Sequence, residues 1–468
     1  MPVRTPSLPP PRAAAPARGR RRGGVLLRHE LRALLSIAGP LVVSQLGAVA
    51  MTTTDTIMVG PLGPVSLAAA GVASGVQMVV LMFCTGTTIG MTTLVSQATG
   101  AGEAAGARKA LGQGLLVALA LSVPQVIVLL LGRPILLLLG QDPEVAELGG
   151  QFMRAMAAGM PAFMVFFVFR QYLEGMGRTL PSVVITFLGV IANAVGNRLL
   201  IFGVGAIPPL GVAGSGWSTT LVRWLMMLVM VGYLVWRGEL GVRSRLPRPD
   251  PALLRRLLAI GLPIGGQIVA EIGIFALAAV MMGWLGPLQL AAHQVAISIA
   301  STTFMVALGS SMAGAIRVGQ HVGGRGRRAV RRSAVATYLV VLAFMAACAL
   351  LFVVAPRGLI GLYSHDAALM EVAVPLLLLA AAFQIFDGAQ VAGLSILRGT
   401  GDTQVPMLIT LLGYWIVGFP VAYILGFHTS LGPAGIWTGL VAALGVVGLL
   451  LFFRVRRVLW RKPEATAE

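Results

Sequence analysis

GLPIGGQIVAEIGIFALAAVMMGWLG, residues 261–286, is the stretch of sequence that decides the fold class. Glu271 is its single charged residue, and its apolar residues run on instead of alternating with polar ones. About 20 such residues are enough to cross the hydrocarbon core of a bilayer as an α-helix. A helix satisfies its own backbone hydrogen bonds, which a bilayer requires because its core holds no water. The stretch therefore predicts a membrane-spanning helix.

The composition of the whole chain agrees with this prediction. Of its 468 residues, 57% are hydrophobic and only 11% are charged, which is more apolar side chain than a soluble protein of this length could bury. The net charge of +19 would also suit a nucleic-acid-binding protein, but the arginines gather in the gaps between apolar stretches. We therefore expect lipid as the solvent and no nucleic acid as a partner.

Clusters of glycine, proline and charged residues divide the rest of the chain into similar apolar stretches. Six precede and six follow a hydrophilic linker at residues 237–256. This predicts an all-α polytopic membrane protein with twelve transmembrane helices. We expect the spans near residues 34–59, 66–97, 109–132, 145–169, 180–203, 212–236, 257–282, 288–316, 333–354, 370–396, 405–427 and 433–453.

The positive residues predict how the chain is oriented in the membrane. We expect a disordered basic tail at 1–33 and a second basic tail at 454–468. In a twelve-span arrangement these tails, the linker and the arginine-rich loop at 325–332 all lie on one side. Loops rich in Lys and Arg stay on the cytoplasmic side. Both termini are therefore expected in the cytoplasm.

The two halves of the chain, 34–236 and 257–453, repeat one another at an offset of 223 residues. Each half has six spans, so both halves enter the membrane from the same side. This predicts two six-helix lobes related by a pseudo-twofold axis along the membrane normal, with a cleft between them and alternating access by rocking. The matched pairs include Pro40 with Pro263, Gly60 with Gly283, Gly63 with Gly286, Pro64 with Pro287, Gln97 with Gln320 and Gly100 with Gly323.

Three acidic residues, Asp55, Glu271 and Asp387, fall inside apolar spans. A carboxylate at bilayer depth costs at least roughly 2.5–3.5 kcal/mol, so such residues are rare and usually functional. The structural alternative is a carboxylate that only pairs with a neighbouring helix. A carboxylate held in hydrocarbon is stable when it is protonated or when it binds a cation such as Na⁺. These three residues are therefore the candidate cation-coupling groups.

Other polar residues in the spans add to this set. Asn193 and Asn197 lie one helical turn apart and so share a helix face, while Thr219 and Gln294 lie in later spans. Such side chains often only bridge helices. Pro40, fifteen residues before Asp55, is either a static kink or a hinge in the first span. The histidines and cysteines show no zinc-type spacing, so we expect no structural or catalytic metal site.

Four segments resemble motifs of the MATE (multidrug and toxic compound extrusion) transporters, and most closely their bacterial NorM-like branch. They are TDTIMVGPLG at 54–63, GLPIGGQIVAEIG at 261–273, IRVGQHVG at 316–323 and DGAQVAGLSILRGTGDTQVP at 387–406. The resemblance covers roughly residues 34–455. It implies a secondary active antiporter of the bacterial inner membrane that exports amphipathic organic cations in exchange for H⁺ or Na⁺.

The resemblance also implies where the coupling ion binds. Asn197 stands where related members have an aspartate, which removes a charge from the N-lobe site. Phe383 stands where some sodium-coupled members have a tyrosine, which removes a Na⁺ ligand near Glu271 and Asp387 and favours H⁺. The cation-coupling residues are expected to be Asp55, Asn193, Asn197 and Thr219 in the N-lobe, and Glu271, Asp387, Gln294 and Asp366 in the C-lobe.

Two other functions compete with this interpretation. A lipid-linked sugar flippase of the same superfamily would have more spans and a cleft lined with basic residues. A membrane-embedded enzyme would need a nucleophile–base pair, a metal cluster or a phosphate-binding loop, and none stands out in the sequence. We therefore expect a transporter that is not an enzyme, a monomer with no cofactor besides its coupling ion, with cationic drugs and membrane lipids as its partners.

Overall fold

The computed structural model describes residues 21–205, 208–240 and 248–460, and its regular elements are all helices. Eleven of these helices are long and apolar enough to cross a membrane. The bent pair Pro143–Ala157 and Met160–Gly175 makes a twelfth span if it is counted as one. The expected all-α polytopic fold is confirmed.

The N-terminal half contains eight α-helices. Its spans are α1 (Arg21–Val59), α2 (Pro64–Gly100), α3 (Ala104–Leu130), the bent pair α5 (Pro143–Ala157) and α6 (Met160–Gly175), α7 (Leu180–Phe202) and α8 (Val212–Trp236). A 3₁₀ turn, η1 (Gly60–Leu62), follows α1, and a short helix, α4 (Gly132–Leu138), follows α3.

The C-terminal half repeats this plan. Its spans are α9 (Pro251–Leu285), α10 (Pro287–Gly323), α11 (Arg327–Val354), α13 (Ala367–Thr400), the run of α14 (Gln404–Leu411), the π-helix η2 (Leu412–Gly418) and α15 (Phe419–Phe427), and α16 (Pro433–Trp460). The short helix α12 (Pro356–Gly361) follows α11, just as α4 follows α3.

The structure corrects two expectations about the N-terminal half. Helix α1 begins at Arg21, inside the segment 1–33 that was expected to be disordered, while residues 1–20 lie outside the described part. The span expected at 145–169 is two helices bent by 52° at residues 158–159. The bend coincides with Gly159, where a Cβ would lie 2.9 Å from the Cα of Thr220 on α8.

The linker between the two lobes and the C-terminal tail also differ from expectation. The linker expected at 237–256 is shorter, because α8 ends at Trp236 and α9 begins at Pro251; residues 241–247 lie outside the described part. The C-terminal tail expected from residue 454 is helical as far as Trp460, and residues 461–468 are not described.

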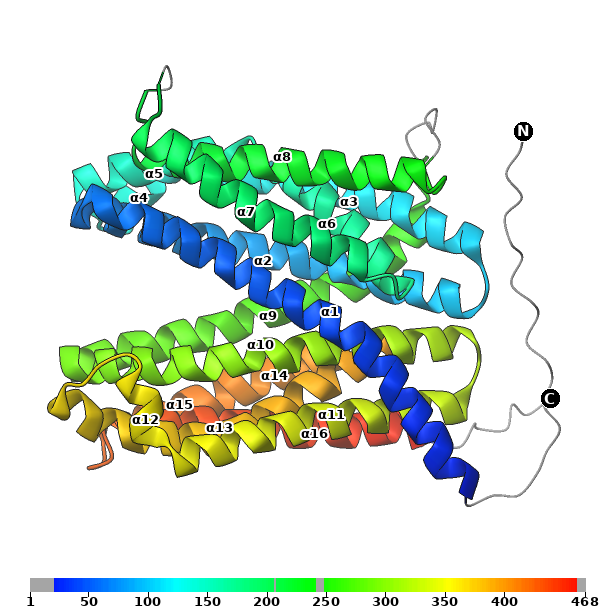
Figure 1. Cartoon of the computed structure of the whole chain (residues 1–468). Helices are drawn as coiled ribbons and strands as arrows, with labels where there is room; N and C mark the ends of the chain where they lie inside the picture. The colour runs from blue at the N-terminus through cyan, green and yellow to red at the C-terminus, as the bar shows by residue number, and fades with distance from the viewer. Residues whose placement is uncertain (1–20, 206–207, 241–247, 461–468) are drawn as a thin grey trace.

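Helices α1 and α9 each cross from one lobe to the other. Figure 1 shows the lobes as two layers, with α1 running obliquely from the N-terminal layer across the C-terminal one. Its later residues pack on α7, whereas Leu34 and Leu41 in its first half share an apolar core with Ile316 of α10. In the same way, Ile260 near the start of α9 packs into the N-lobe core with Met91 of α2.

Both crossings lie near one end of the bundle, which we call the basic end. It holds the starts of α1 and α9, the α2–α3 and α10–α11 loops and the end of α16, where most of the arginines gather. Between described residues, the hydrogen bonds that join the two lobes all lie toward this end. The lobes are therefore joined at one end of the bundle.

Candidate functional site

The N-lobe site joins α1, α7 and α8 around Asp55. Asn197 Nδ2 donates to Asp55 Oδ1 at 2.7 Å, and Thr219 Oγ1 donates to Oδ2 at 3.4 Å. Asn193 Nδ2 lies 3.3 Å from Thr219 Oγ1. Asn193, Asn197 and Thr219 are all buried. The structure therefore brings the four N-lobe residues named from the sequence together.

Close packing between α7 and α8 makes this site possible. A Cβ on Gly196 would lie 2.5 Å from Ser218 Oγ, so a larger residue there would force the Ser218 hydroxyl to turn away from its present position. Ser218 Oγ donates in turn to the backbone oxygen of Asn193 at 3.1 Å. The side chain of Asn193 is thereby fixed toward α8, and Asn197 points one turn further along the same face.

Arg223, one turn after Thr219 on α8, adds a buried positive charge to the N-lobe. It lies close enough to Asp55 for the two charges to interact. Its guanidinium lies 5.0 Å from the centroid of the Phe163 ring, and Nη1 lies 3.7 Å from Met160 Sδ. Arg223 thus offsets the charge of Asp55 from within the protein.

The C-lobe site joins α9, α13 and η2 around Glu271. Gln390 Nε2 donates to Glu271 Oε1 at 3.1 Å, and Tyr414 Oη lies 3.4 Å from the same oxygen and 2.8 Å from Gln390 Oε1. Asp387 is buried, three residues before Gln390, and close enough to Glu271 for the two carboxylates to repel each other when both are ionised. A buried acid and a partly exposed one therefore lie close together in the C-lobe.

Arg398 supplies the positive charge of the C-lobe site. Its Nη2 donates to Gln267 Oε1 at 3.2 Å, and Gln267 lies one turn before Glu271 on α9. The charges of Arg398 and Glu271 interact. The buried Nε of Arg398 has no hydrogen-bond partner among the described residues. Arg398 is thus held at the edge of the acidic pair without forming a direct ion pair with it.

The structure does not bring Gln294 or Asp366 into this C-lobe cluster. Gln294 is exposed on α10. Asp366 is exposed at the start of α13, where its Oδ1 accepts hydrogen bonds from the backbone N–H of Ala368 at 2.8 Å and Leu369 at 3.1 Å. Asp366 is therefore a helix N-cap. Pro40 lies inside α1, which is continuous from Arg21 to Val59.

Tyr414, Gln390, Arg398 and Arg223 were not picked out as site residues from the sequence. Gln390 follows Asp387 by three positions, so the shared helix face was a usable signal. Tyr414 has no such local partner, because its contacts to Glu271 and Gln390 come from distant helices. At position 383 a phenylalanine packs against Phe275 and Trp437, with ring centroids 5.9 and 5.8 Å apart.

Replacing Tyr414 by Phe tests whether the hydroxyl supports Glu271. We expect transport to slow about tenfold, because loss of one buried hydrogen bond that leaves Gln390 Oε1 unpaired costs roughly 1–3 kcal/mol. Initial rates of transport into proteoliposomes measure the effect. Tyr423, which is exposed and packs against Phe427, is the matched control: Tyr423→Phe should transport normally. Equal rates in the two variants would contradict a role for the Tyr414 hydroxyl.

Comparison with known proteins gives a consistent result. The MatE family model matches residues 40–199 and 263–424, which are the two repeats. The probable multidrug resistance protein NorM of Pseudomonas putida is 38% identical over 93% of this chain and 97% of its own length. The multidrug resistance protein PmpM of Pseudomonas aeruginosa is 34% identical, and the match covers 93% of each chain.

Solved structures share the fold at lower sequence identity. A multidrug resistance MATE family transporter in an outward-facing conformation superposes with a TM-score of 0.83 at 22% identity, over 94% of this chain and 98% of that one. The eukaryotic MATE transporter AtDTX14 gives 0.80 at 21% identity, over 92% and 96% of the two chains. The two-lobe arrangement expected from the internal repeat is confirmed by these neighbours.

Proposed function

Because this chain belongs to the MatE family, as a bacterial NorM-like MATE transporter, we propose that it exports amphipathic organic cations in exchange for H⁺ at the C-lobe site. The family relationship supports multidrug efflux across the bacterial inner membrane. The identity of the exchanged ion and the lobe that binds it do not follow from the family, and we propose them from the charges of the two sites.

The balance of charge at each site is the observation that carries this proposal. At the C-lobe site, Glu271 and Asp387 can carry two negative charges against the one positive charge of Arg398, which leaves one negative charge. At the N-lobe site, Asp55 faces Arg223, one charge of each sign, which leaves none. A buried site with an uncompensated negative charge needs a proton, a metal cation or an organic cation. The C-lobe site is therefore the one that attracts a mobile cation.

Exchange then follows from competition for the same carboxylates. A proton that neutralises Glu271 or Asp387 removes the charge that holds an organic cation in the cleft, and the loss of the proton restores it. An inward-falling ion supplies about 2.3 kcal/mol per charge for each 100 mV of membrane potential, and about 1.4 kcal/mol per pH unit for a proton. In each transport cycle the inward movement of the ion thus drives the export of the drug.

The surroundings of the acids favour H⁺ over Na⁺. Two adjacent buried carboxylates can hold one shared proton with no further ligand. Na⁺ needs several oxygen ligands, whereas the ring of Phe383 offers none and Gln390 Oε1 already accepts a hydrogen bond from the Tyr414 hydroxyl. The positive-inside rule supports placing the basic end, and with it both termini, on the cytoplasmic side.

Transport of a fluorescent organic cation by purified protein in liposomes tests the proposal. We expect an imposed pH gradient to drive uptake, and a sodium gradient at constant pH on both sides to have no effect. Protein-free liposomes and a proton ionophore are the controls. Uptake driven by sodium alone would contradict H⁺ coupling, and an absence of uptake under both gradients would contradict organic-cation exchange.

A further inference from the structure

We propose that the two lobe crossings at the basic end have different tasks, and that the crossing of α1 over α10 and α11 is the one that opens. An ion-pair latch between Glu30 and Arg317 holds it shut, while the equivalent crossing of α9 over α2 and α3 stays closed as a fixed joint. The inference concerns a conformational change. The opening itself is argued from the structure, and only its role in transport rests on the proposed function.

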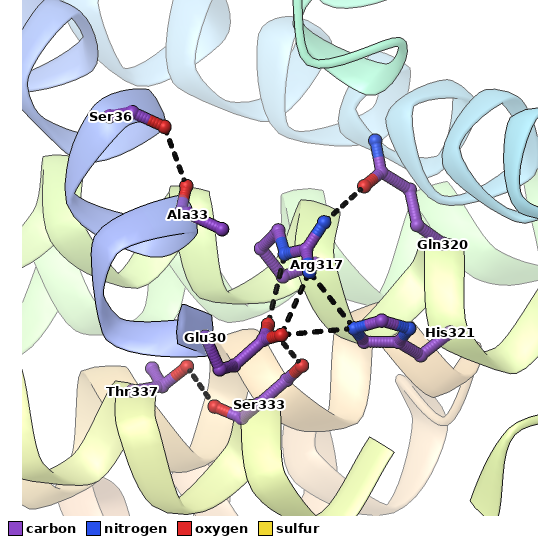
Figure 2. A network of polar contacts seen from close by, with 8 residues as sticks. All are labelled: Glu30, Ala33, Ser36, Arg317, Gln320, His321, Ser333 and Thr337. Carbon is purple, nitrogen blue, oxygen red and sulfur yellow. Dashed lines mark hydrogen bonds and ion pairs between the residues drawn. The ribbon is translucent and has the colours of Figure 1, made fainter. Parts of the chain in front are cut away.

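The latch consists of Glu30 on α1, Arg317 and His321 on α10, and Ser333 on α11 (Figure 2). Arg317 grips the carboxylate with two parallel hydrogen bonds, Nε to Oε1 at 2.9 Å and Nη2 to Oε2 at 2.8 Å. Ser333 Oγ donates to Oε1 at 2.7 Å, and His321 Nε2 lies 3.3 Å from Oε2. Glu30 is thus fully engaged by the C-lobe, and two-point binding of this kind fixes the orientation of both partners.

The position of the latch ties the two lobes together. Asp55 near the far end of α1 belongs to the N-lobe site, whereas Glu30 near its start is held by C-lobe helices. Arg317 Nη1 also donates to Gln320 Oε1 at 3.2 Å, and Gln320 Nε2 reaches back to the backbone oxygen of Gly175 on α6 at 3.5 Å. Release of Glu30 therefore frees α1 and also loosens the hold on Gln320.

The internal repeat allows the α1 and α9 crossings to be compared position by position, which indicates which one opens and which one stays closed. At the offset of 223 residues, the latch residues Glu30, Arg317, His321 and Ser333 correspond to Leu253, Leu94, Ala98 and Ala110. At the α9 crossing all four positions are apolar, and they pack into the N-lobe core, where Leu94 and Ala110 are buried. One crossing is held by charges at the positions where the other is held by apolar contact.

The physical consequence is an unequal cost of opening. Separation of either crossing exposes apolar side chains to water, since Leu34 and Leu41 of α1 are also buried against α10. At the α9 crossing the four matched positions add further apolar surface to that loss. When the α1 crossing separates, the charges of Glu30 and Arg317 regain hydration, which offsets much of the broken ion pair. Arg317 and His321 already have side chains 17% and 25% exposed, so water reaches the rim of the latch in the closed form. At these four matched positions the α1 crossing is therefore the easier of the two to separate.

Cross-linking tests this assignment with a matched control in the same chain. In a variant that lacks Cys84 and Cys348, the exposed pair His29→Cys with Arg328→Cys, which leaves the latch intact, is joined by a bis-methanethiosulfonate reagent. We expect cross-linking to stop transport and a reducing agent to restore it. The equivalent exposed pair, Ala252→Cys with Ala105→Cys, should cross-link without loss of transport. Loss of transport in both pairs, or only in the second, would overturn the assignment.

A distance measurement tests the latch without any transport assay. Spin labels at the exposed positions 29 and 328 span the α1 crossing, and labels at the equivalent exposed positions 252 and 105 span the α9 crossing. We expect Glu30→Gln and Arg317→Gln to raise the separated population at the first pair about tenfold, because each breaks the two-point, charge-assisted pairing of a buried carboxylate. The double variant should add little, because both changes break one interaction.

The second label pair serves as the internal standard in every variant. Its distance distribution should stay unchanged, which also shows that each variant is folded. Unchanged distances at the first pair in both single variants, or separation at the second pair instead, would overturn the latch. Because these measurements need no substrate, a failure of organic-cation transport would leave them interpretable.

Discussion

Asp387→Asn and Glu271→Gln are each expected to abolish drug efflux while the protein remains in the membrane. The C-lobe site has two negative charges, on Glu271 and Asp387, and one positive charge, on Arg398. Either change removes one negative charge, so the site is neutral without a bound cation. The amide keeps the size of the acid, so the packing of α9 and α13 is preserved. The measurement is accumulation of a fluorescent cation in cells that lack their own exporters, with the amount of membrane protein determined in parallel.

The matched control for these variants is Asp366→Asn. Asp366 is exposed and serves as a helix N-cap, a role that asparagine fills about as well. We therefore expect normal efflux from it, although the acid lies on the same helix as Asp387. Normal efflux from both Asp387→Asn and Glu271→Gln would contradict the carboxylate mechanism, and loss of efflux from all three would show that the effect is not specific to the two acids of the C-lobe site.

Most of the fold could be predicted because the bilayer imposes simple rules. Length and hydrophobicity located the spans, and the fixed offset between halves gave the two-lobe arrangement. The start of α1 was missed because prolines and arginines dominate residues 1–33, yet Leu31 and Leu34 give this part of the helix an apolar face that packs on the C-lobe. The bend at residues 158–159 was missed, although Gly159 and Pro161 at the start of α6 are signals for a break in the helix.

The sites could be predicted only as far as single residues stood out. An acid within an apolar span is conspicuous, so Asp55, Glu271 and Asp387 were found. The arginines that face them were not, because Arg223 and Arg398 reach their acids through the packing of separate helices. The difference in charge balance between the N-lobe and C-lobe sites therefore becomes visible only in the tertiary structure.

The repeat was visible in the sequence, but its structural meaning was not. Gln97 and Gly100 match Gln320 and Gly323 at the same offset. In the structure these matched residues touch across the lobe boundary: a Cβ on Gly100 would lie 1.8 Å from the backbone oxygen of Gln320, and a Cβ on Gly323 1.8 Å from that of Gln97. A sequence repeat of this kind thus marks a contact between the repeats.

Gly261→Ala is expected to be one of the most damaging small substitutions at the boundary between the lobes. The added Cβ would lie 1.9 Å from the backbone oxygen of Thr87, where α9 crosses α2 backbone against backbone. The helices must move apart, and overpacking of this kind costs about 1–3 kcal/mol or more. We expect a lower thermal unfolding midpoint in detergent and a smaller yield of folded protein.

Gly71→Ala is the control that separates this clash from a general effect of alanine. Gly71 also lies in a long helix, α2, but a Cβ there would meet nothing within 4 Å. Because alanine favours a helix over glycine by roughly 0.5–1 kcal/mol, this variant should be neutral or slightly more stable. Equal unfolding midpoints for the two variants would mean that the α2–α9 crossing can yield, and a crossing that yields could not serve as the fixed joint between the lobes.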